Sequence, residues 1–95
     1  MDYTAALAKL DAWSKDIEGF ARHVSRNKQN NVDAANDMLL MIQLYNGYMR
    51  QLHNEATVCR QRKRVTLRFQ KLYNRANEYR EVVESNRLMY SLMFA

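Results

Sequence analysis

The sequence predicts an all-α fold, a three-helix antiparallel bundle made by one domain over residues 1–95. It has no proline and only two glycines, so the residues that usually punctuate strands and hairpins are almost absent. Hydrophobic residues make up 47% of the chain and charged residues 26%, which is enough apolar material for one core. Apolar residues also recur at steps of three and four along three segments, the spacing that places side chains on one side of a helix.

The first predicted helix covers about residues 3–25. Asp2 or Thr4 can cap its start, because a side-chain oxygen there accepts a hydrogen bond from a free N–H group of the first turn. The polar segment SRNKQNN, which begins at Ser25, predicts the turn that ends it. Its apolar stripe consists of Ala6, Leu10, Trp13, Ile17, Phe20 and Val24.

The second predicted helix covers about residues 31–55. Its stripe begins at Met38 and repeats to Cys59, and Asp33 and Asp37 lie near its start, where the helix dipole favours acids. Further apolar residues widen this stripe well round the helix, which is typical of a helix with more than one neighbour. We therefore expect the second helix to be the centre of the bundle.

The third predicted helix covers about residues 60–93. The stripe of the second helix fails after Cys59, and a new one starts at Val65, about half a turn round the helix. A turn within residues 54–64 explains this change, with Asn54 ending the second helix in the left-handed conformation. The alternative is a helical hairpin whose second helix is one long helix, 31–93, that oligomerises. We favour three helices, because they bury both stripes within one chain.

Surplus apolar residues predict a contact with a protein partner or a homo-oligomer. The C-terminal segment LMYSLMFA, which begins at Leu88, projects apolar side chains away from the stripe of the third helix, and the flanks of the second helix exceed what the first can cover. Exposed apolar patches of this kind are typical of association sites. The predicted contact residues are Leu40, Leu44, Tyr48, Leu88, Met89, Leu92 and Met93.

The positive charge is concentrated in the last third of the chain. Residues 1–59 hold six Lys/Arg and seven Asp/Glu, whereas residues 60–95 hold nine and three. On the third predicted helix, five of these cations line a single stripe with no acid between its ends: Arg60, Arg64, Arg68, Lys71 and Arg75. Such a stripe suits an acidic protein partner or nucleic-acid phosphates. The predicted binding residues are Arg60, Arg62, Lys63, Arg64, Arg68, Lys71 and Arg75.

Three aromatic residues lie among these cations. Phe69 and Tyr79 fall in the packing stripe, so we expect them in the core. Tyr73 falls off that stripe, which would leave it free to stack on bases.

The sequence carries no catalytic or metal-binding motif. His23 and His53 have no carboxylate or cysteine at ligand spacing, and Cys59 is the single cysteine. We therefore expect no enzymatic activity, metal or cofactor. The opening MDYTAALAKL lacks the positive charge of a secretory signal, and the longest apolar run, residues 38–42, is far short of the roughly 20 residues that span a bilayer. These features predict a soluble protein of the reducing cytoplasm.

Together, these observations predict a small non-enzymatic helical interaction protein. It would act by helix–helix association with itself or with a protein partner, and its basic flank would face an acidic partner. The alternative, from a different class, is a nucleic-acid-binding protein that holds phosphates with the basic stripe of residues 60–75.

Overall fold

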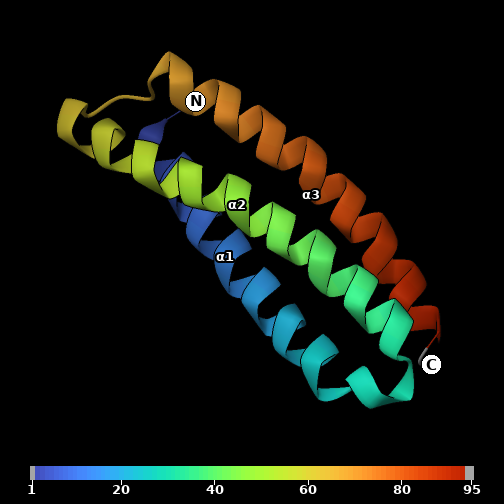
Figure 1. The fold of residues 1–95 in the computed structure, drawn as a ribbon. Helices are drawn as coiled ribbons and strands as arrows, with labels where there is room; N and C mark the ends of the chain where they lie inside the picture. Colours follow the sequence, from blue (N-terminus) through green and yellow to red (C-terminus); the bar gives the residue numbers. More distant parts are fainter. Residues whose placement is uncertain (1, 94–95) are drawn as a thin grey trace.

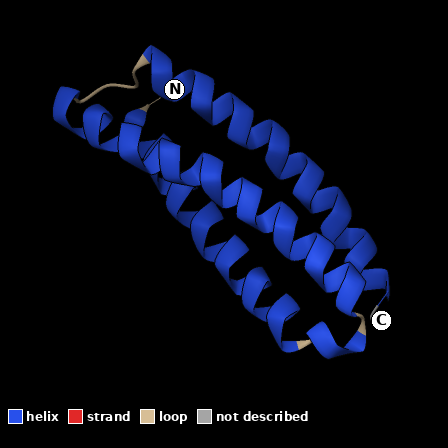
Figure 2. Ribbon diagram, in the orientation of Figure 1, coloured by secondary structure: helices blue, strands red, loops and turns tan. Residues whose placement is uncertain are grey.

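The chain forms the predicted three-helix antiparallel bundle. In a computed structural model, which describes residues 2–93, helices α1 (Tyr3–Arg26), α2 (Val32–Arg62) and α3 (Leu67–Met93) run in alternating directions along an elongated body (Figure 1). A short 3₁₀ helix, Lys28–Asn30, joins α1 to α2, and the other connections are short loops (Figure 2). The Cα atoms extend over 47 × 19 × 18 Å. Both α1 and α3 pack directly on α2, which confirms the predicted central helix.

The start of α1 is capped by Asp2, one of the two predicted caps. The Asp2 carboxylate accepts a hydrogen bond from the backbone N–H of Thr4 at 3.4 Å. Asn27 closes the other end, where its side-chain amide donates to the carbonyl of His23 at 2.9 Å. Asn31 then caps α2 by accepting from the N–H of Ala34 at 3.1 Å. The polar turn between these helices therefore forms where the sequence predicts it.

The end of α2 was predicted too early. Asn54 is an exposed residue within the helix, which continues to Arg62 and buries Ala56 and Cys59 in its last two turns. The left-handed residue is Lys63, with φ 54° and ψ 36°. Left-handed backbone is costly for a residue with a Cβ, but here the N–H groups of Lys63 and its neighbour both donate to the Cys59 carbonyl.

The turn after Lys63 also rules out one continuous helix over residues 31–93, because α3 begins only at Leu67. Thr66 holds this turn in three ways. Its hydroxyl accepts from the Phe69 N–H at 3.1 Å and donates to the Glu55 carboxylate of α2 at 2.8 Å, and its carbonyl accepts from Gln70. Glu55 also lies 3.7 Å from the guanidinium of Arg68. Side chains from both helices therefore fix the point at which the chain reverses.

Large side chains fill the space between α1 and α3. Trp13 stacks on Tyr73 with ring centroids 5.2 Å apart, and Phe20 meets Tyr90 edge-on at 5.9 Å. Tyr73 is therefore a buried core residue, and the prediction that it lies off the packing surface is wrong. Tyr73 faces α1, whereas the stripe predicted from the sequence contains only the residues of α3 that face α2. Phe69 is buried as predicted, and Tyr79 is half-buried against the core.

Two arginines of α3 extend over these aromatic rings. The guanidinium of Arg80 lies 4.9 Å from the centroid of the Trp13 ring, and that of Arg87 lies 4.5 Å from the Phe20 ring. Arg87 also pairs with Asp16 of α1 at 2.9 Å. Cations over aromatic faces are stabilising, so these two arginines belong to the packing of the bundle and are not part of a binding surface.

Tyr45, at the centre of α2, is 1% exposed, and its hydroxyl has no hydrogen-bond partner. Burial raises the pKa of Tyr45 from 10.0 to about 12, because the apolar surroundings disfavour the phenolate. Burial likewise raises the pKa values of Tyr79 and Tyr90.

Replacing Thr66 with alanine should lower the free energy of unfolding by about 1–2 kcal/mol. The variant loses the cap of α3 and leaves Glu55 without its hydroxyl donor. Chemical denaturation measures the change. Thr57→Ala is the matched control, because Thr57 is an exposed residue of α2, and it should change stability by less than about 0.5 kcal/mol. Equal effects of the two substitutions would contradict the assigned role of Thr66.

Tyr45→Phe should raise the free energy of unfolding at pH 7 by about 1 kcal/mol, because it removes a buried hydroxyl without a partner. It should also reduce the loss of folding stability as the pH rises above 10. The folded-state pKa of Tyr45 exceeds the unfolded value, so its contribution is complete below pH 10 and is lost as the pH rises from 10 to about 12. Denaturation of both proteins at pH 7, 10 and 11 tests this. The prediction is refuted if the variant is less stable than the parent at pH 7 and loses as much stability as the parent between pH 7 and 11.

Candidate interaction surface

The exposed apolar residues lie on two of the three helices. Within residues 2–93, no large hydrophobic side chain of α1 is exposed, whereas α2 and α3 expose nine. These are Val32, Leu40 and Leu44 on α2, and Leu67, Val82, Leu88, Met89, Leu92 and Met93 on α3. The outer side of α1 therefore presents polar, charged and small side chains, and the large exposed apolar residues belong to α2 and α3.

Four of these nine residues, together with three half-buried neighbours, form one surface, which we call the α2–α3 face. It consists of Met41, Leu44 and Tyr48 from α2 and Tyr79, Val82, Met89 and Met93 from α3. Steps of three and four keep each set on one side of its helix.

A ring contact and a shared groove connect the two helices across this face. The rings of Tyr48 and Tyr79 lie 5.5 Å apart at its middle. At one end, an open groove of about 490 Å³ places Met41 of α2 beside Met89 and Met93 of α3.

The α2–α3 face points away from α1. Tyr73, Arg80 and Arg87 reach α1 from α3. The residues two positions further along the chain are Arg75, Val82 and Met89, and two residues correspond to about 200° around a helix. The face is therefore on the side of α3 opposite to the α1 contacts.

The predicted contact residues divide into three groups. Leu44, Met89 and Met93 are exposed on the α2–α3 face, and Leu40 is exposed beside it. Leu88 and Leu92 are 64% and 68% exposed, but lie further round α3 and make a separate apolar strip. Tyr48 is half-buried against Tyr79, so it is part of the floor of the face. The last two residues of the predicted LMYSLMFA patch, 94–95, lie outside the described residues.

The two ends of the α2–α3 face carry opposite charge. Asp33 and Asp37 line the groove that holds Met89 and Met93, at the start of α2 and the end of α3. At the other end, Arg68, Lys71 and Arg75 occupy the first turns of α3. In the sequence, the two aspartates stand out only as acids that the dipole of the second helix favours. That they lie at the end of this face follows only from the pairing of α2 with α3. The α3 part of the face could have been found in the sequence, from the spacing of Tyr79, Val82, Met89 and Met93.

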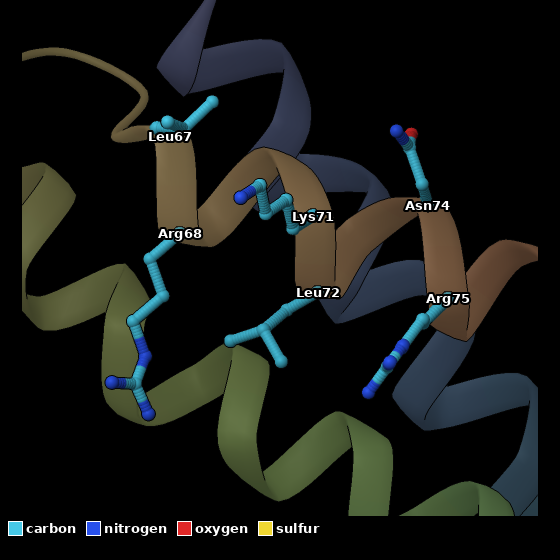
Figure 3. A pocket seen from close by; sticks show the side chains of 6 residues that line it. All are labelled: Leu67, Arg68, Lys71, Leu72, Asn74 and Arg75. Atoms are coloured by element: carbon cyan, nitrogen blue, oxygen red, sulfur yellow. The ribbon is translucent and has the colours of Figure 1, made fainter.

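The seven predicted basic residues do not form one stripe, because the turn at residues 63–66 separates them. Arg60, Arg62, Lys63 and Arg64 are exposed at the tip of the bundle. Arg68, Lys71 and Arg75 line a shallow hollow on α3 together with Leu67, Leu72 and Asn74 (Figure 3).

Within the hollow, Arg68 and Leu72 extend toward α2, while Leu67 and Asn74 point away from it (Figure 3). Arg68 is partly neutralised by Glu55. The other six predicted basic residues form no ion pair with any acid of residues 2–93. They are therefore free cations that a ligand or partner can engage.

The histidines and the cysteine have structural contacts. His53 Nε2 lies 3.0 Å from the Ser14 hydroxyl between α1 and α2, and His23 lies beside Asn27 at the end of α1. Cys59 is a buried free thiol. Across the described part of the chain, no cluster of three or more His, Cys, Asp or Glu side chains is placed to hold a metal ion. No helix within residues 2–93 is long and apolar enough to cross a membrane.

Comparison of the chain with protein-family models, curated proteins and solved structures finds no match.

Proposed function

We propose that this chain is a non-enzymatic helical interaction protein of the reducing cytoplasm, and that it works by helix–helix association through the α2–α3 face. The observation that carries the proposal is the one-sided distribution of exposed apolar residues: nine on α2 and α3 and none on α1 within residues 2–93. If exposed apolar residues were distributed at random, some of them would also be expected on α1. Contiguous apolar surface of this kind is typical of protein–protein contacts.

The composition of the face also favours a protein partner. It contains tyrosine at its middle and methionine toward one end, two residue types that are enriched in protein interfaces, and both of its ends are charged. Methionine side chains are flexible and polarisable, so they adapt to the surface of another helix. The cations at one end would attract an acidic partner and orient it.

A photo-crosslinking residue in place of Leu44 should form covalent adducts with a protein in the native host cells. The same residue in place of Ala8, which is exposed on α1, is the matched control and should form none. The mass of each adduct separates a second copy of the 11.3-kDa chain from another protein. Lack of adducts at position 44 and also in place of Met89 would refute an association through this face.

Val82→Glu should reduce the adduct yield from position 44 by roughly tenfold or more, because it places an unpaired charge in a desolvated contact. Val82 is 47% exposed, so the variant should retain the thermal stability of the parent, as circular dichroism can verify. Ala8→Glu adds the same charge on α1 and should leave the yield unchanged. An unchanged yield from the Val82 variant would contradict the proposed face.

A second candidate function, nucleic-acid binding, is favoured by the six predicted basic residues that have no acidic partner. Arg60, Arg62, Lys63 and Arg64 protrude at the tip, where phosphates can approach them.

Fluorescence anisotropy with labelled duplex and single-stranded oligonucleotides tests the second candidate. If the tip holds phosphates, log K should fall against log[salt] with a slope of about −0.9 for each contact on duplex. Arg62→Glu with Arg64→Glu should then abolish binding, while Lys9→Glu on the exposed side of α1 should have a small effect. No saturable binding at low salt would exclude this function.

A further inference from the structure

We infer that the partner of the α2–α3 face is the same face of a second copy of the chain, and that the two copies lie antiparallel about a two-fold axis. This inference rests on the proposed association through the face and names its partner. A two-fold interface must be self-complementary, so that each residue meets its counterpart in both directions. The charges, the apolar centre and the size of the face meet this requirement.

The charges of the face are arranged for antiparallel pairing. Asp33 and Asp37 mark one end, and Lys71 and Arg75 mark the other. When two such faces meet antiparallel, the acidic end of each copy lies against the basic end of the other. Parallel pairing would place like charges together at both ends, which is unfavourable across an interface.

The axial positions of these residues agree with one two-fold axis. The Tyr48–Tyr79 ring contact sets the register between α2 and α3. Arg75, four residues before Tyr79 on the antiparallel helix, is then level with position 52 of α2. Asp37 lies about 15 residues below that level, or about 22 Å. The midpoint falls near Leu44, and Val82 lies at the same height.

Asp33 and Lys71 give the same midpoint. Lys71 lies eight residues before Tyr79, so it is level with position 56 of α2, and half-way between positions 33 and 56 is again close to Leu44. One axis through the apolar pair Leu44 and Val82 therefore serves both charge pairs. The same axis brings Met41 of each copy level with the Tyr48–Tyr79 rings of the other, a sulfur–aromatic contact that is itself favourable.

Other acids near the basic end do not cancel its charge. The Glu55 carboxylate already accepts the Thr66 hydroxyl and pairs with Arg68, so it is occupied within the chain. Glu78 is exposed close to Arg75. With Glu55 and Arg68 paired, Lys71 and Arg75 still exceed Glu78 by one positive charge. The acidic end has no cation among the residues that line its groove.

The side of the bundle that carries the face is large enough for a stable dimer. That whole side, including the tip that would stay outside the contact, is 47 Å long and 19 Å wide and has a projected area of about 900 Å². Stable protein interfaces bury about 800 Å² on each partner. A dimer would therefore use nearly the full length of the face, including both charged ends.

Sedimentation velocity over a range of concentrations tests the dimer with four proteins: the parent, Asp37→Lys, Arg75→Glu, and the chain with both substitutions. The parent should form a species of twice 11.3 kDa. Each single reversal should weaken dimerisation about tenfold or more, because it places like charges opposite each other. The doubly substituted chain should recover the parent affinity, and so should an equimolar mixture of the two single variants. Asp11→Lys and Lys9→Glu, both on the exposed side of α1, are the matched controls and should leave the affinity unchanged.

A parent that stays monomeric at millimolar concentration would overturn the dimer, and so would single reversals without effect or a double reversal that fails to restore affinity. Circular dichroism melts confirm that every variant is folded, since Asp37 and Arg75 are exposed and make no ion pair within residues 2–93. Failure of the dimer is distinguishable from failure of the proposed function. A monomeric parent whose position 44 crosslinks to another protein would refute the second copy as partner and leave the association through the face in place.

Discussion

The hydrogen-bonded turn between α2 and α3 is the constraint on which the rest of the structure depends. The apolar stripe of α3 can meet α2 only if the chain reverses after Arg62, and no glycine or proline is present to make that reversal easy. Lys63 takes the left-handed conformation, while Thr66 begins the next helix and binds Glu55, eleven residues earlier. Contacts from both helices thus offset the strain at one residue. The register that this turn sets continues to Tyr48 and Tyr79 and determines which side chains meet in the α2–α3 face.

The three helices could be predicted from the sequence, but the position of the turn between α2 and α3 could not. Steps of three and four between apolar residues depend only on helix geometry, so the three helices, the central place of α2 and the burial of Phe69 could be predicted. The turn depends on tertiary hydrogen bonds to Glu55, which no local pattern reveals. Asn54 has the better intrinsic preference for the left-handed conformation, but ending α2 there would leave Ala56 and Cys59 outside the helix that buries them.

The candidate site was predictable in part for the same reason. Leu44, Met89 and Met93 stand out as surplus apolar residues in the sequence, and their exposure follows from packing that is already complete without them. The five-residue basic stripe required a helix through residues 63–66, so it failed when the turn formed there. Arg80 and Arg87 show the converse limit. In sequence they resemble other surface cations, but they lie over Trp13 and Phe20 between α1 and α3, where the bundle needs long side chains to span the gap.

The two candidate functions draw on different cations, and the structure separates them. In an antiparallel dimer, Lys71 and Arg75 face the acids of the other copy and are withdrawn from phosphates. The tip cations, Arg60 to Arg64, lie beyond the paired region, because their level on α2 is about 18 residues from the axis near Leu44. Two such tips would lie at opposite ends of the dimer, about 55 Å apart. An anion that spans both tips would therefore have to be long and extended, whereas a short acidic segment could engage only one tip at a time. The position of α3 in the bundle thus divides one basic sequence into a part that matches the chain's own acids and a part that faces outward.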